Sequence, residues 1–226
     1  EILDSLFKKY EPANMSNVNE YSTYIACSVM TGNTKNLDAK IRNGILKYGT
    51  IIRNHPNGDS IYSRLYKITK VSRDEMKLLG QKYNRKFNFE LRKRIIRMEG
   101  EDQMARIPFL DYNKMDELQK KHEKEIEEII AKYGYPNHNV TGYILNDKND
   151  PVSFEVVFFH QTAENKKKYL PMLSNNLIEG KLSPFEYGSI VDRIYIDNNQ
   201  LYYGTFTGEV PLINENKIDS IRKTIG

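Results

Sequence analysis

A long amphipathic segment between residues 111 and 133 places the strongest limit on how this chain can fold. Its apolar residues recur three and four positions apart, which puts them on one face of an α-helix, and Lys and Glu pairs cover the other faces. The apolar face comprises Met115, Leu118, Ile126, Ile129, Ile130 and Tyr133, with His122 as its polar member. Gly134 follows and predicts the end of the helix. The segment therefore predicts a helical domain around one long helix.

Helical spacing and helix-end signals recur in most of the remaining chain. Predicted helices cover residues 1–10, 21–30, 37–48, about 72–83, about 87–107, 152–163, 166–179, 183–191 and 214–224. Residues 61–68 fit a short helix or an extended connector. Asp150 and Pro151 resemble an N-cap followed by proline at the first helical position, which favours helix over the alternative of a buried strand for 152–163.

Two alternating segments near the C-terminus predict the strand content. They run from Arg193 to Asp197 and from Leu201 to Phe206, and the pair Asn198-Asn199 separates them, which is typical of a β-hairpin. The predicted fold class is therefore mainly α (α+β), with helical N-terminal hairpins followed by a helical domain that carries a small β-hairpin. We place the first region at residues 1–84 and the second at 85–226.

Residues 24–49 contain two short helical patterns joined by a Gly-Asn turn, which predicts a helical hairpin. The pattern resembles a degenerate tetratricopeptide unit, and an ordinary helical hairpin is the alternative. A single such unit cannot bury its own apolar face, so either interpretation requires neighbouring helices.

The charge distribution, the cysteine count and the length of the apolar runs limit the kinds of partner and the cellular location that we expect. The 34 Lys and Arg residues are interleaved with 30 Asp and Glu, so no basic stripe indicates nucleic acid, and none is expected as a partner. A lone cysteine, Cys27, excludes an intramolecular disulfide and a thiolate metal cage. No apolar run reaches the ~20 residues of a membrane span. A soluble protein is therefore expected, and because the chain begins at Glu1 it is either cytoplasmic or exported with its signal peptide removed.

Four polar residues fall on helix faces that are otherwise apolar: Asp102, Arg106, His122 and His160. A buried charge or imidazole needs a partner, so we expect these side chains to converge. One interpretation is a structural ion-pair network that also includes Asp192 and Arg193. The other is a pocket in which a general base and two guanidinium groups act on an anionic substrate.

The chain from about Met98 to its end resembles a bacterial family known as a domain of unknown function. The motifs that carry the resemblance are Asp102-Gln103 with Arg106, Gly134-Tyr135-Pro136, His160, Asp192-Arg193, Gln200, Tyr203-Gly204-Thr205 and Arg222. The chain departs from the family pattern at Gln119 and His122, where an Asp-x-x-Asn pair is expected, and at Phe206, where glutamine is usual. The resemblance implies a related fold and supplies no reaction.

These observations predict a helical scaffold or a protein- or peptide-binding module with a structural polar cluster. The alternative is a hydrolase or transferase that acts on an anionic small molecule. The candidate catalytic residues are His160 as general base, Asp192 and Arg193, and the candidate binding residues are Asp102, Gln103, Arg106, His122, Gln200 and Tyr203. No metal site and no cofactor are predicted. The enzyme requires His160, Arg106 and Arg193 to face one cavity, whereas the scaffold has them paired and sealed.

Overall fold

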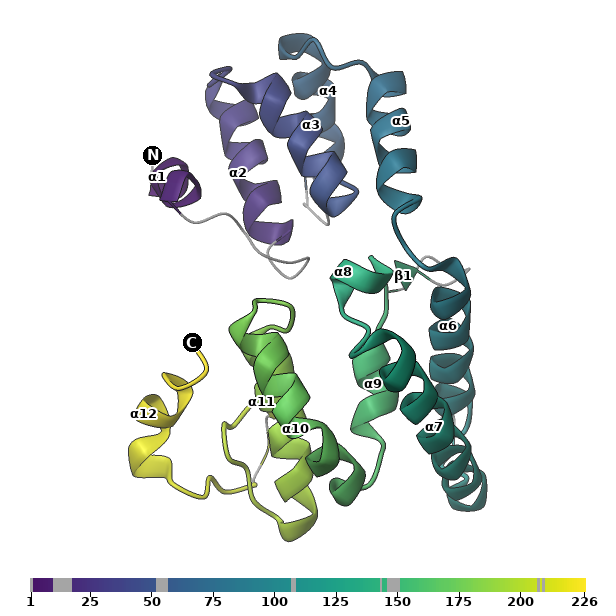
Figure 1. The fold of residues 1–226 in the computed structure, drawn as a ribbon. Helices are drawn as coiled ribbons and strands as arrows, with labels where there is room; N and C mark the ends of the chain where they lie inside the picture. The colour runs from purple at the N-terminus through teal and green to yellow at the C-terminus, as the bar shows by residue number, and fades with distance from the viewer. Residues whose placement is uncertain are drawn as a thin grey trace. The chain divides into compact units, whose positions relative to one another are not determined.

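The computed structural model describes residues 2–9, 18–51, 57–106, 109–142, 144–145, 151–206, 208 and 210–226. The chain divides into two compact units, an N-terminal unit from Glu1 to Asn88 and a C-terminal unit from Phe89 to Gly226 (Figure 1). Both are mainly helical, as the sequence predicted. The sequence predicted the boundary between residues 84 and 85, and the packing of the chain places it after residue 88.

The N-terminal unit consists of a short helix and two helical hairpins. Its helices are α1 (Ile2–Lys9), α2 (Val18–Thr31), α3 (Leu37–Tyr48), α4 (Gly58–Ile68) and α5 (Arg73–Asn84). Helix α2 packs against α3 and α4, and α3 packs against α5, so each helix of the second hairpin covers one of the first. Figure 1 shows α2 to α5 standing side by side. The segment 61–68 is helical and not an extended connector.

Local signals set the ends of α3 and α5. Gly49 ends α3 with a φ of 77°, and a Cβ there would lie 2.5 Å from the ring of Tyr83, so only glycine fits. Ser72 caps α5 by accepting a hydrogen bond from the Glu75 amide, at 3.1 Å. Glu75 does not return a hydrogen bond to complete a capping box, because its carboxylate binds Arg42 of α3, with 2.6 Å between Oε1 and Nε.

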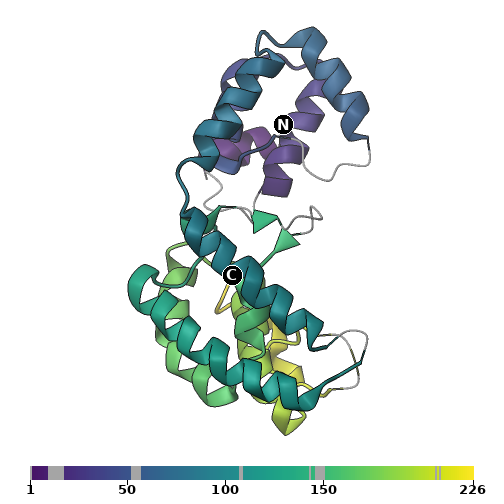
Figure 2. The ribbon, with the colours of Figure 1, turned by 90° about the vertical axis from the view of Figure 1, so that its right-hand side faces the viewer.

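The C-terminal unit is built around a short central helix. Its helices are α6 (Phe89–Met104), α7 (Tyr112–Tyr133), α8 (His138–Thr141), α9 (Phe154–Phe159), α10 (Ala163–Ile178), α11 (Pro184–Tyr195) and α12 (Ile218–Arg222). Helix α9 contacts both α6 and α11, and α10 packs along α11. Figure 2 shows α6 and α7 lying side by side as a long pair.

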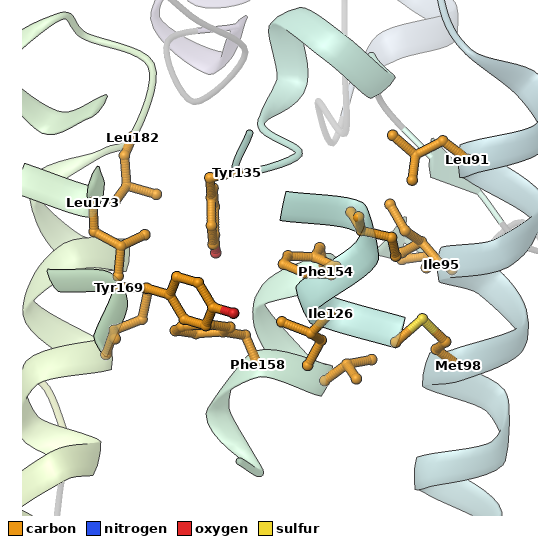
Figure 3. Packing of buried hydrophobic residues seen from close by; sticks show 14 residues of the cluster. Leu91, Ile95, Met98, Ile126, Tyr135, Phe154, Phe158, Tyr169, Leu173 and Leu182 are labelled. Atoms are coloured by element: carbon orange, nitrogen blue, oxygen red, sulfur yellow. The ribbon is translucent and has the colours of Figure 1, made fainter. Parts of the chain in front are cut away.

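Aromatic residues of α9 fill the core of this unit. Phe154 and Phe158 lie between Leu91, Ile95 and Met98 of α6 on one side and Leu173 and Leu182 on the other, with Tyr135 above them (Figure 3). The rings of Tyr135 and Phe154 meet edge to face, with centroids 5.4 Å apart. Full burial of each large apolar side chain contributes about 1.5–3 kcal/mol, so this cluster anchors α9.

The single helix predicted over residues 152–163 is wrong. Pro151–Val152 forms a strand, β2, that pairs antiparallel with β1 (Ile144–Leu145), and the chain then forms α9 and α10 in succession. Ser153 caps α9 and Thr162 caps α10, each through its hydroxyl oxygen. Two cap residues nine positions apart start two separate helices, and His160 ends the first of them. The predicted N-cap Asp150 lies outside the described residues.

The predicted β-hairpin over residues 193–206 is not formed. Residues 193–195 complete α11, a 3-10 turn follows at Ile196–Asn198, and Leu201 makes an isolated parallel bridge with Leu212. The capping box of Ser183 and Glu186 starts α11, and Ile190 and Ile194 then lie four residues apart on its buried face. The alternation that predicted a strand was therefore the end of a helical pattern.

The C-terminal segment is less regular than the predicted helix over residues 214–224. It contains a 3-10 turn at Glu215–Lys217 followed by α12. None of the helices in the described part of the chain is both long enough and apolar enough to cross a membrane.

Candidate functional site

A cluster around Asp102 joins three of the predicted site residues. Asp102 follows Met98 by one turn on the buried face of α6 and is 6% exposed. Its Oδ2 atom lies 2.7 Å from Nδ1 of His160, and Arg106 approaches it with Nε and Nη2, each at 3.1 Å. Gln103 donates a fourth hydrogen bond from Nε2, at 3.2 Å. The structure thus brings Asp102, Gln103, Arg106 and His160 together.

The cluster holds Asp102 charged and fixes the orientation of His160. Desolvation raises the pKa of Asp102, but hydrogen bonds from His160 and Arg106 outweigh it, and the pKa is lowered. Because Nδ1 of His160 faces this carboxylate, the second ring nitrogen, Nε2, points away from it. Within the described part of the chain Nε2 has no hydrogen-bond partner, and the His160 side chain is 18% exposed.

Lys166 supports the same corner and was not among the residues predicted for the site. It is 3% exposed, and its Nζ donates to the carbonyls of Phe159 and Gln161, at 2.9 and 2.8 Å. Burial, together with the nearby Arg193, lowers its pKa to about 8. These carbonyls flank His160 where α9 ends, so Lys166 supplies donors that the helix end lacks.

Asp192, predicted as a catalytic residue, accepts hydrogen bonds from residues 202–205. It is fully buried on α11, and its Oδ1 accepts from the backbone amides of Tyr202 and Tyr203, both at 2.6 Å. Its Oδ2 accepts from the amide and the hydroxyl of Thr205, at 2.7 and 2.8 Å. No hydrogen bond joins Asp192 to His160 among the described residues. Asp192 therefore holds the segment 202–205 in place of the missing hairpin partner.

Arg193 and Tyr203 pack against aromatic rings. The guanidinium of Arg193 lies 5.5 Å from the centroid of Phe206, whose ring contacts that of Phe159. Tyr203 is buried, its ring lies edge-on to that of Tyr187, and its carbonyl accepts from Nε of Arg222, at 2.9 Å. These residues tie the C-terminal segment to α11 and α9.

His122 and Gln200 do not join the Asp102 cluster. His122 is buried on α7, and its Nε2 lies 3.1 Å from Oε2 of Glu101 on α6. Desolvation raises the pKa of Glu101, but bonds from Lys121, His122 and Arg97 lower it to about 2. This network joins α6 to α7. Gln200 is exposed, in the turn that follows α11.

The N-terminal unit contains a hollow of about 310 Å³. It is lined by Ile45, Gly49, Thr50, Ile51, Tyr62, Tyr66, Met76, Lys77 and Gly80. The rings of Tyr62 and Tyr66 are stacked with centroids 6.0 Å apart. Gly80 leaves space in its wall, since a Cβ added there would meet only the Gly49 carbonyl, at 4.0 Å. The sequence signal was the four-residue spacing of the two tyrosines, which places them on one helix face.

A small pocket of about 20 Å³ lies in the C-terminal unit between the N-terminal ends of α9 and α11. Such a volume holds about one water molecule. Its lining includes Glu155 and Glu186, one from each helix. Burial, with the nearby charge of Glu186, raises the pKa of Glu155 to about 8. This carboxyl group is therefore protonated at neutral pH.

Among the described residues, no group of three or more His, Cys, Asp or Glu side chains is placed to hold a metal ion. Comparison of the chain with protein-family models, with curated proteins and with solved structures found no match. The family resemblance of the C-terminal half stays a prediction.

Proposed function

We propose that this chain is a helical scaffold that binds a protein or peptide through its N-terminal unit, while the polar clusters of the C-terminal unit are structural. The observation that carries the proposal is the hollow lined by Tyr62, Tyr66 and Met76. Its volume of about 310 Å³ matches the lower range of ligand-binding pockets, roughly 300–1,000 Å³. Tyrosine and methionine are enriched in protein interfaces because their side chains offer large, adaptable contact areas.

The hydrogen bonds of the C-terminal unit support the structural role of its polar clusters. Both oxygens of Asp102 and both oxygens of Asp192 accept hydrogen bonds from groups of the same unit. Arg106 is engaged by Asp102 through two nitrogens, a geometry that fixes two side chains relative to each other. Groups held in this way join helices and loops without requiring a ligand.

A random peptide library panned against the full chain tests this proposal. A Gly80→Leu variant serves as the matched control, because its side chain fills the hollow. We expect recovered peptides that bind the wild type and lose at least tenfold in affinity for the variant. Circular dichroism and a thermal melt check that the variant folds. Peptides that bind both proteins equally would place recognition outside the hollow and overturn the proposal.

A second candidate function is proton transfer at His160 in a hydrolase or transferase acting on an anionic small molecule. The observation that favours it is the 2.7 Å contact of Nδ1 with Asp102, which leaves Nε2 as a proton acceptor. In a hydrolysis, Nε2 would take a proton from water, the water oxygen would attack the substrate, and the imidazolium would return the proton to the leaving group. Arg106 and Arg193 would attract the anion.

A thermal-shift screen of the full chain against anionic metabolites tests this candidate, with His160→Gln as the variant and His122→Gln as the control. A catalytic site predicts a ligand that stabilises the wild type and His122→Gln, shows turnover with both, and loses turnover with His160→Gln. A His160→Gln variant that turns over the ligand at the wild-type rate would eliminate the candidate.

A further inference from the structure

The charges of the chain are divided unequally between its two units. The N-terminal unit contains 15 Lys and Arg against 8 Asp and Glu, whereas the C-terminal unit contains 19 against 22. The small net charge of the whole chain, +4, conceals this difference. A unit with seven more positive than negative side chains attracts acidic partners at a distance of about one Debye length, roughly 8–10 Å at moderate salt.

Two of these positive charges lie at the hollow. Lys77 lines it, and the guanidinium of Arg73, one turn earlier on α5, lies 4.4 Å from the centroid of the Tyr66 ring. Within the described part of the chain, neither Lys77 nor Arg73 forms an ion pair. By contrast, Glu75 on the same helix is bound to Arg42, so its charge is compensated internally.

The floor of the hollow is apolar. Ile45 and Ile51 are almost fully buried beneath it, and the stacked rings of Tyr62 and Tyr66 form one wall. This combination of an apolar floor and uncompensated positive charge at the rim suits a ligand with an apolar side chain beside carboxylates. The volume of about 310 Å³ admits one or two side chains and not a folded element.

We propose that the hollow binds an acidic peptide segment that inserts one aromatic side chain between Tyr62, Tyr66 and Met76, while its carboxylates face Arg73 and Lys77. This inference rests on the proposed function and adds the chemistry of the partner. The aromatic side chain supplies affinity through the rings and the apolar floor. The carboxylates select the partner and accelerate its association.

Fluorescence anisotropy with labelled nine-residue peptides tests the inference on the full chain. The probes carry a central Phe flanked by Glu, by Lys or by Ser, and a fourth peptide has Glu flanks with a central Ala. We expect the Glu-flanked Phe peptide to bind at least tenfold more tightly than the other three. Raising the salt concentration from 50 to 300 mM should weaken it severalfold, because the attraction is between exposed charges.

Three variants separate the contributions. Lys77→Glu reverses a charge at the rim and should lower the affinity for the Glu-flanked Phe peptide at least fivefold. Lys82→Glu makes the same change on α5 at an exposed position that does not line the hollow, and should stay within twofold of the wild type. Gly80→Leu fills the hollow and should abolish binding, whereas Gly80→Ala adds only one methyl group and should retain it.

The outcomes distinguish this inference from the proposed function. If the Ser-flanked and Glu-flanked peptides bind equally and Gly80→Leu abolishes both, the hollow binds peptides and the acidic preference is wrong. If Lys77→Glu and Lys82→Glu weaken binding equally, the attraction belongs to the unit as a whole and the assignment to the hollow is wrong. If no peptide binds the wild type, peptide binding at this hollow is wrong as well.

Discussion

The two units use charged side chains in opposite ways. In the N-terminal unit the Arg42–Glu75 pair joins α3 to α5 at the surface, and the core is apolar. In the C-terminal unit Asp102, Lys166 and Asp192 are all buried. Among the described residues, every buried charged side chain belongs to this second unit.

The difference follows from where the backbone lacks partners. The described residues of the N-terminal unit lie almost wholly in helices, which satisfy their own amides and carbonyls. The C-terminal unit contains a short helix with an abrupt end and a segment, 202–205, that pairs with no strand among the described residues. Lys166 donates to the carbonyls at the end of α9, and Asp192 accepts from the amides of the segment 202–205. Buried charges there substitute for secondary structure.

Removal of the Asp192 carboxylate gives the largest expected effect. Asp192→Ala leaves three backbone amides and one hydroxyl without their acceptor, in a site that excludes water. We expect the free energy of unfolding to fall by about 3–5 kcal/mol. Urea titration followed by circular dichroism measures it. The control is Asp116→Ala, an exposed position on α7, which should stay within about 0.5 kcal/mol. If the two variants lose the same free energy of unfolding, the view that buried charges replace backbone pairing in this unit is wrong.

Asp102→Asn tests a second buried charge of the C-terminal unit, and we expect a smaller loss of stability than for Asp192→Ala. The amide cannot accept all four hydrogen bonds, and Arg106 loses its counter-charge, so we expect a loss of roughly 2–3 kcal/mol near pH 7. The lowered pKa of Asp102 in the folded state means that its contribution is present above pH ~4 and is lost as the pH falls further. The difference between variant and wild type should therefore shrink below pH 4, and a difference independent of pH would contradict this assignment.

The sequence predicted the N-terminal unit's helices except α4, whose segment was left open, and the Asp102 cluster without its His122 member, because these features depend on short-range periodicity. The helical stripe that leads from Leu91 through Ile95 and Met98 to Asp102 placed a carboxylate on a buried face, where it had to find a partner. His160 was correctly associated with that carboxylate, although it caps α9 and does not lie within a helix.

Three features could not be predicted from local pattern. The hairpin prediction failed because a short alternating segment fits a strand or the end of a helix, and only the tertiary position of Asp192 decides between them. Lys166 sits in a run of three lysines, of which only the first meets the end of α9. The hollow is lined by Gly49 and Gly80, which lie far apart in sequence and meet only in the folded unit.

Glu155 offers a test in which the two units should respond to pH in opposite directions. Its folded pKa of about 8 lies above the ordinary value of 4.5, so the folded state holds a proton that the unfolded chain releases. The contribution of the protonated Glu155 carboxyl group to stability is complete below pH 4.5 and is lost as the pH rises to about 8. Glu155→Gln should remove this loss and stabilise the protein at pH 9 by on the order of 2 kcal/mol.

The control for Glu155 is Glu75→Gln in the N-terminal unit. The hydrogen bond from Arg42 lowers the pKa of Glu75, so its contribution appears as the pH rises and is lost in acid. Unfolding titrations of both variants at pH 5 and pH 9 measure the contribution of Glu155, and titrations at pH 3 and pH 5 measure that of Glu75. A Glu155→Gln variant that behaves as the wild type at pH 5 and at pH 9 would mean that Glu155 is not protonated in the folded protein.

Gly80→Ala gives the smallest expected change in stability. It tests whether the N-terminal unit contains open space beside Gly80, in contrast to the buried charges of the C-terminal unit. Gly80 lies inside α5, where alanine favours the helix by about 0.5–1 kcal/mol, and its new methyl group meets only the Gly49 carbonyl, at 4.0 Å. Gly44→Ala in α3 is the matched opposite, because its Cβ would lie 2.5 Å from the Tyr21 ring and 2.9 Å from Ile51. We expect Gly80→Ala to raise the unfolding midpoint and Gly44→Ala to lower it. A loss of stability in both variants would mean that the hollow is closed by other atoms of the unit, and the peptide site would lose the space on which it depends.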